Sequence, residues 1–104
     1  MQTIMVRYKT KPEHAEANVA LVRAVFESLQ KLAPAGLCYA SYRLEDGVSF
    51  VHVATHAEPN PLSLLPAFQA FQAQIKERIE GPPVVTELFA VGAYGLAPSP
   101  VVAR

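Results

Sequence analysis

Two histidines, His52 and His56, lie four residues apart in the segment SFVHVATH, which covers residues 49–56. The segment has the alternation of a β-strand, so both rings are expected on one face of a sheet. An imidazole titrates near neutral pH and can act as a general base or bind a metal ion. Four strand residues span about 13 Å, whereas a zinc–nitrogen bond is about 2 Å long. One ion therefore cannot comfortably reach both rings, and we expect no metal site.

The role of His52 has two interpretations that its position alone does not separate. In the first, a neutral imidazole forms hydrogen bonds with Ser41 or with a tyrosine hydroxyl and is purely structural. In the second, His52 is a general base that removes a phenolic or enolic proton, giving an electron-rich anion that can react with O2. His56 ends the strand, where it either faces solvent or contributes to the same ligand site.

The elements that must position these residues follow from hydrophobic periodicity and turn residues. Strands are predicted over 3–9, 37–44, 48–56 and 84–91, and amphipathic helices from about 12 to 32 and from about 65 to 80. The order strand, helix, strand, strand, helix, strand is typical of the ferredoxin-like α+β fold, in which a four-stranded antiparallel sheet carries two helices on one face. We expect one domain over residues 1–95 and an extended or flexible tail over 96–104.

The hairpin register decides which side chains neighbour His52. A two-residue turn at Asp46-Gly47 places Ser41 opposite His52. A three-residue loop with a bulge would shift the register and bring Tyr42 to His52 instead.

Strand alternation divides the predicted sheet into a face covered by the helices and an uncovered face. The more apolar sets, Val51 and Val53 with Ile4 and Val6, are assigned to the helices. The uncovered face is then expected to carry Met5, Arg7, Lys9, Leu37, Tyr39, Ser41, Arg43, Phe50, His52, Ala54 and His56. Such a face is too apolar to stay wet and too polar for a sealed core. We therefore predict a twofold homodimer formed through the sheet faces.

Two further residues carry expectations of their own. Arg7 lies in the middle of a strand and needs an acceptor, which is either Glu87 in a structural ion pair or an anionic group of a ligand. Cys38 is the single cysteine, so no internal disulfide can form. We expect it to be a buried small hydrophobic residue.

Composition excludes several classes of partner. Lys plus Arg and Asp plus Glu are balanced at nine each, so the chain lacks the cationic excess that nucleic acid or an anionic membrane requires. No apolar run reaches the length of a bilayer span. Arg7 and Lys9 interrupt the N-terminal apolar residues, which does not fit a signal peptide and favours a cytoplasmic location.

Three segments together resemble the dimeric α+β-barrel superfamily, and within it the antibiotic biosynthesis monooxygenase-like domains. They are MVRYKTKPEHAE at the start, FVHVATH followed by a helix with FQAFQ, and VVTELFAVG near the end. The resemblance covers residues 1 to about 95. It implies a dimer whose barrels hold small aromatic or polyketide-like molecules, some of them oxidised by O2 without flavin or metal.

The resulting hypothesis is a homodimer with a small-molecule pocket between each sheet and its second helix, and a cofactor-independent monooxygenase activity. His52 is the predicted base and Arg7 the predicted anion clamp. Tyr39, Ser41, Phe50, Met5 and His56 are the predicted substrate-binding residues. The alternative is a non-catalytic ligand-binding or stress-related module of the same fold. A cavity of a few hundred Å³ that opens to His52 would favour ligand chemistry, whereas a filled interior would favour a structural role.

Overall fold

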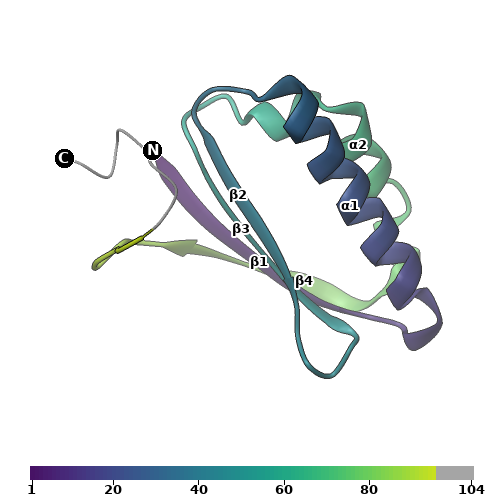
Figure 1. Ribbon diagram of the computed structural model, residues 1–104. Helices are drawn as coiled ribbons and strands as arrows, with labels where there is room; N and C mark the ends of the chain where they lie inside the picture. The colour runs from purple at the N-terminus through teal and green to yellow at the C-terminus, as the bar shows by residue number, and fades with distance from the viewer. Residues whose placement is uncertain (96–104) are drawn as a thin grey trace.

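The computed structural model describes residues 1–95 and contains one four-stranded antiparallel sheet with helices on one face (Figure 1). The strands are β1 (Gln2–Thr10), β2 (Leu37–Arg43), β3 (Ser49–His56) and β4 (Ile79–Leu88), in the spatial order β2-β3-β1-β4. The helices are η1 (Pro12–His14), α1 (Ala15–Leu32), η2 (Pro61–Leu64), α2 (Pro66–Gln72) and α3 (Ile75–Arg78). The predicted ferredoxin-like α+β fold is confirmed; the predicted tail lies outside the described residues.

Helix α1 begins and ends close to where the sequence places it. Pro12 opens a short 3-10 turn that leads into the helix, as its fixed φ allows. The helix ends at Ala33, which adopts a left-handed conformation and donates its backbone N–H to Leu29. No helix among the described residues is long and apolar enough to cross a lipid bilayer.

The second helical segment is shorter than predicted. Gln74 has a φ of 61°, which interrupts the helix between α2 and the single turn of α3. The chain then enters β4 at Ile79, so Gly81-Pro82-Pro83 lies inside a strand and does not merely end a helix. Prolines are tolerated there because β4 is an edge strand and its pairing with β1 shifts register between Arg7 and Lys9.

The β2–β3 hairpin has the register predicted from a turn at Asp46-Gly47, with Ser41 opposite His52 and Tyr42 opposite Val51. The loop closes on residues 45–48, since Leu44 donates its N–H to Ser49 at 2.8 Å. The Asp46 carboxylate accepts hydrogen bonds from the backbone N–H groups of Val48 and Ser49. The alternative register that would bring Tyr42 to His52 is not formed.

The predicted assignment of the β3 faces is wrong. Register pairs His52 with Val6 and Phe50 with Tyr8. The side chains of His52 and Phe50 are both buried, and the His52 ring contacts Phe71 of α2, so this face of the sheet is the one that the helices cover. The structure thus places Tyr39, Ser41, Phe50, His52, Ala54 and His56 on the helix-covered face. Val51 and Val53 lie on the open face. The physical reason is size, because the larger rings of Phe50 and His52 fill the space beneath the helices better than valines do.

The open face of the sheet is largely apolar in this protomer. It carries Thr3, Met5, Arg7, Lys9, Cys38, Ala40, Tyr42, Val51, Val53, Thr55, Val84, Thr86 and Leu88. Met5, Arg7 and Lys9 are on the predicted side. Cys38 is exposed, which contradicts the expectation of a buried residue, because its position on β2 alternates with those that face the helices.

Candidate functional site

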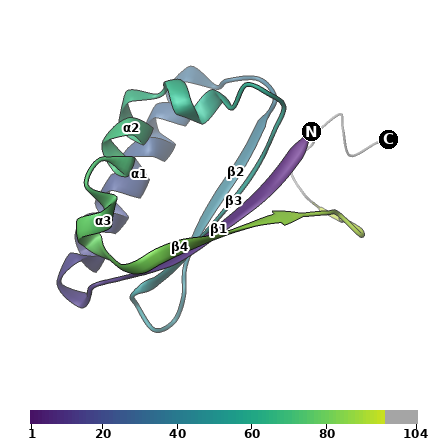
Figure 2. The same cartoon turned by 180° about the vertical axis from the view of Figure 1, so that it is seen from behind.

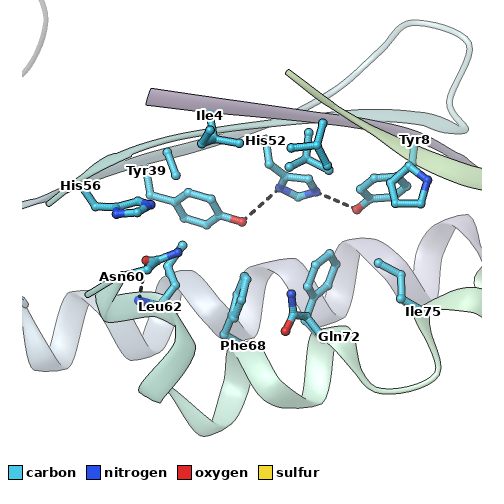
Figure 3. A pocket seen from close by; sticks show the side chains of 15 residues that line it. Ile4, Tyr8, Tyr39, His52, His56, Asn60, Leu62, Phe68, Gln72 and Ile75 are labelled. Carbon is cyan, nitrogen blue, oxygen red and sulfur yellow. Dashed lines mark hydrogen bonds between the residues drawn. The ribbon is translucent and has the colours of Figure 1, made fainter. Parts of the chain in front are cut away.

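A cavity of about 460 Å³ lies between the helix-covered face of the sheet and α2 (Figure 3). Its walls are mainly apolar and include Ile4, Val6, Leu62, Phe68, Phe71 and Ile75. Its polar side chains are Tyr8, Tyr39, His52, His56, Asn60 and Gln72. Gln72, Pro83 and Val85 are also exposed, so the cavity reaches the surface between α2 and β4. Mostly apolar walls with a few fixed polar groups are typical of small-molecule sites.

Three rings form a row along the sheet side of this cavity. Figure 3 shows Tyr39, His52 and Tyr8 side by side, with α2 residues opposite. His52 Nε2 lies 2.7 Å from the Tyr8 hydroxyl, and His52 Nδ1 lies 3.2 Å from the Tyr39 hydroxyl. Ser41 Oγ also forms a hydrogen bond with Nδ1. The row results from strand pairing, because Tyr8, His52 and Tyr39 come from the neighbouring strands β1, β3 and β2.

The row continues into the interior through Asn18 and Arg78. Asn18 Nδ2 donates to the Tyr8 hydroxyl at 2.8 Å. Arg78 Nε donates to Asn18 Oδ1 at 3.2 Å. The other donors of Arg78 bind the backbone carbonyls of Phe71 and Ala73. A single polar network thereby links six residues, which are Arg78 on α3, Asn18 on α1, Tyr8 on β1, His52 on β3, and Ser41 and Tyr39 on β2.

Arg78 is a buried cation with no carboxylate partner among residues 1–95. Arg78 is only 7% exposed. The single ion pair in the described part of the chain joins Arg43 and Glu16. Besides its neutral oxygen acceptors, Arg78 has its guanidinium carbon 5.5 Å from the centre of the Phe71 ring, a cation–π contact. Burying such a charge without an anion is costly.

Burial sets the protonation states along the row. Desolvation lowers the pKa of His52 to about 4, so its imidazole is neutral at pH 7. Desolvation raises the pKa of Tyr8 to about 12, against the smaller lowering effect of the hydrogen bond from Asn18. Desolvation likewise raises the pKa of Tyr39. Both phenols therefore keep their protons at neutral pH.

His56 lines the other end of the cavity, beside Asn60. It is buried, and its Nδ1 lies 3.0 Å from the backbone carbonyl of Ala57. A carbonyl only accepts, so Nδ1 must carry the hydrogen. In the neutral ring Nε2 then has a lone pair that no described residue occupies.

The structure brings most, but not all, of the predicted site residues together. Tyr39, His52 and His56 line the cavity, and Ser41 contacts the ring of His52. Phe50 stacks on Tyr8 with ring centres 5.7 Å apart.

Met5 and Arg7 lie on the opposite face of the sheet, so Arg7 and His52 do not share a site within one protomer. The predicted ion pair between Arg7 and Glu87 is not formed among the described residues. Glu87 of β4 lies opposite Ile4 of β1, on the other face of the sheet from Arg7.

Sequence reasoning missed Tyr8, Asn18 and Arg78. A usable signal was present in the helical stripes. Asn18 precedes Val22 and Val25 at the spacing of one helix face, and Arg78 follows Phe71 and Ile75 in the same way. A polar residue within an apolar stripe indicates a buried polar group that needs partners.

Comparisons with known proteins support the fold. Neither the models of protein families nor the curated proteins gave a match. Among solved structures, Rv0793 from Mycobacterium tuberculosis is 22% identical with a TM-score of 0.67, over 88% of this chain and 96% of that one. An antibiotic biosynthesis monooxygenase is 18% identical with a TM-score of 0.66, over 88% and 100% of the two chains.

A third similar structure is a candidate antibiotic biosynthesis monooxygenase from Nitrosomonas europaea, which is 14% identical with a TM-score of 0.71. The match covers 90% of this chain and 93% of that one. At these identities the similarity concerns backbone architecture. The chain therefore has the ferredoxin-like α+β fold seen in the antibiotic biosynthesis monooxygenase-like structures.

Proposed function

We propose that this protein binds a small planar aromatic molecule in the cavity between the sheet and α2 and oxidises it with O2, as a monooxygenase of the antibiotic biosynthesis type. The observation that carries this proposal is the cavity of about 460 Å³, which opens to His52 and is lined by both tyrosines of the row. Rings such as Phe68 and Phe71 offer flat apolar contacts. The structural neighbours described as antibiotic biosynthesis monooxygenases support the same assignment.

The proposed reaction starts with loss of a proton from an enolisable or phenolic ring. The resulting carbanion or phenolate transfers electrons to O2. For a ring methylene beside a carbonyl, CH2 and O2 become C=O and H2O, so atoms and electrons balance without another oxidant. The task of the protein is to orient the ring, stabilise the anion and accept the proton.

The two histidines divide these tasks in our proposal. His52 is a weak base, since its pKa is lowered to about 4, and its two nitrogens are occupied by Tyr8, Ser41 and Tyr39. We therefore assign His52 to binding and orientation. His56 is the proton acceptor, because its Nε2 lone pair has no partner among the described residues.

A homodimer formed through the open faces is part of the proposal. That face exposes Tyr42 and Val84, each 60% exposed, beside Met5, Val51 and Val53. Exposed apolar side chains gathered on one sheet face, here with Arg7 between Val51 and Val84, are typical of an interface. A twofold axis would bury the same surface on both copies and enclose each sheet between helices and a partner.

Oxidation of anthrone, a three-ring ketone with an acidic methylene, tests the proposed activity. O2 uptake and anthraquinone formation should be faster with the protein than in buffer, and His56→Gln should reduce the enzymatic rate by about 100-fold, the effect of losing a general base. Tyr42→Phe, which changes a tyrosine on the other face, is the matched control and should retain the full rate. Equal rates for buffer, wild type and His56→Gln would reject the monooxygenase assignment.

A second candidate is a ligand-binding module without catalysis. It is favoured by the complete hydrogen bonding of His52, which is what a purely structural imidazole requires. Saturable binding of anthrone without acceleration of its oxidation would support this second function.

A further inference from the structure

We infer that the polar network is a one-way chain of hydrogen bonds, running from Arg78 to the Tyr39 hydroxyl, which makes the cavity selective for a ligand that presents a hydrogen-bond acceptor, in particular an oxygen anion. This inference rests on the proposed function for the existence of a ligand. The direction of the chain itself can be tested without one.

The direction is set at Arg78. A guanidinium only donates hydrogen bonds, so the atom of Asn18 that faces Arg78 Nε must be the amide oxygen. That fixes the orientation of the amide and turns its NH2 group toward Tyr8. An amide orientation that is otherwise ambiguous is here decided by chemistry.

The tautomer of His52 follows from the same logic. The Tyr8 oxygen accepts from Asn18 Nδ2, and its remaining neighbour is His52 Nε2. The hydroxyl hydrogen of Tyr8 therefore points to Nε2, which must be without a proton. Since the ring is neutral at pH 7, its hydrogen lies on Nδ1.

The chain ends at the cavity. His52 Nδ1–H donates to the Ser41 and Tyr39 oxygens, so neither hydroxyl can use its own hydrogen on that nitrogen. Among residues 1–95 the Tyr39 hydroxyl has no hydrogen-bond partner besides His52 Nδ1, so its own hydrogen is left without a protein acceptor. Tyr39 lines the cavity, whereas Ser41 does not.

The ligand class follows from this orientation. The free donor at Tyr39 requires an acceptor, which is a carbonyl oxygen, a phenolate or an enolate. Hydrogen bonds in a chain strengthen one another, and the buried Arg78 charge at its origin has no carboxylate to oppose it among the described residues. An amine or an ammonium group at the same point would face a donor and is disfavoured. The chain is thus an electrostatic device for stabilising negative charge on the bound ring.

The first experiment determines the His52 tautomer in the ligand-free protein by long-range 1H–15N correlation spectroscopy. His52→Gln identifies the signals. Wild type should show a protonated Nδ1 and a bare Nε2. In Asn18→Asp the carboxylate accepts from both Arg78 and Tyr8, so the chain should reverse and the proton should move to Nε2. Tyr42→Phe should leave the tautomer unchanged.

The second experiment measures selectivity with 2-naphthol and naphthalene as probes, at pH values below and above the ionisation of free naphthol. Wild type should bind naphtholate about tenfold more tightly than naphthol, the factor that one charge-assisted hydrogen bond supplies. Tyr39→Phe removes only the terminal donor and should abolish this preference. Its affinity for naphthalene should stay within about twofold of wild type, which shows that the apolar walls are intact.

Each result decides the inference. A protonated Nδ1 together with a naphtholate preference that Tyr39→Phe removes supports it. A protonated Nε2 in wild type overturns it, whatever binds. Equal affinity for naphthol and naphtholate overturns the selectivity. Failure of both probes to bind would instead count against the proposed function, while the tautomer still decides the direction of the chain. If Asn18→Asp does not fold, wild type and Tyr39→Phe suffice.

Discussion

The two faces of the sheet differ in a way that inverts the usual arrangement. The face covered by helices carries the histidines, two tyrosines and a cavity, whereas the open face carries Val51, Val53 and Met5 (Figure 2 shows the helices confined to one side). The covered face tolerates polar groups because no buried side-chain nitrogen or oxygen among the described residues lacks a partner. The open face leaves apolar side chains such as Tyr42 and Val84 exposed to solvent, each at 60%. The difference agrees with the proposal that a ligand and a second copy of the chain use opposite sides of one sheet.

The largest loss of stability is expected from a substitution that breaks the polar network of the covered face. Asn18→Leu keeps the volume of the side chain but removes the acceptor for Arg78 and the donor for Tyr8. The buried guanidinium then loses a hydrogen bond that it cannot replace with water. We expect the free energy of unfolding to fall by about 4 kcal/mol, measured by urea denaturation at constant protein concentration. A loss below about 1 kcal/mol would show that the network does not stabilise the covered face.

The free energy of unfolding should also depend on pH through the buried His52, with a somewhat smaller effect than that of Asn18→Leu. The pKa of His52 is about 4 in the folded protein and 6.5 in the unfolded chain, so between these values the unfolded state binds more protons. The free energy of unfolding therefore falls as the pH is lowered from 6.5 toward 4. The total loss that is due to His52 is about 3 kcal/mol, and none of it is felt above pH 6.5. Other groups titrate in this window, and the difference between wild type and His52→Gln isolates the histidine. Parallel pH profiles for the two proteins would contradict the buried, neutral ring.

A substitution on the open face should weaken the proposed dimer. Val53→Asp places a carboxylate in the proposed interface, where two copies of the charge would meet across the twofold axis. The dissociation constant of the dimer should rise by about 100-fold or more, measured by analytical ultracentrifugation, while binding of 2-naphthol is retained. Leu64→Asp, on the helical layer and well exposed, is the matched control and should remain dimeric. A wild-type protein that sediments as a monomer would contradict the proposed homodimer.

The smallest effect is expected at Arg7. Its side chain points away from the cavity, so Arg7→Gln should change the affinity for 2-naphthol by less than about twofold, whereas Arg78→Gln should remove the preference for naphtholate. Fluorescence titration of both variants checks this contrast. If Arg7→Gln weakens naphtholate binding more than Arg78→Gln does, Arg7 and not Arg78 is the residue that favours the anion.

The order of elements and the hairpin register could be predicted because they depend on local chemistry. Asp46-Gly47 specifies a turn, and the stripes on the helices specify their inner faces. The faces of β3 could not be predicted, because Phe50 and His52 alternate with Val51 and Val53 and both sets are suited to burial. Alternation identifies a face only when the other side is clearly polar.

The break at Gln74 and the network around Arg78 depend on tertiary contacts. No residue pattern in or after α2 predicts that Gln74 adopts a left-handed backbone conformation. Asn18 and Arg78 are 60 residues apart, and their partnership appears only when α1 and α3 meet. Their positions in apolar stripes indicate burial, but not the identity of the partner.

We propose that a ligand binds on the helix-covered face and that the open face packs against a second copy of the chain. Methyl NMR spectra recorded during a titration with 2-naphthol, at constant protein concentration, test this most directly. Saturable shifts are expected for the methyl groups of Ile4, Val6 and Ile75, which line the cavity, and none for those of Val51 and Val53. Shifts at Val51 and Val53 without shifts at the cavity methyls would contradict it.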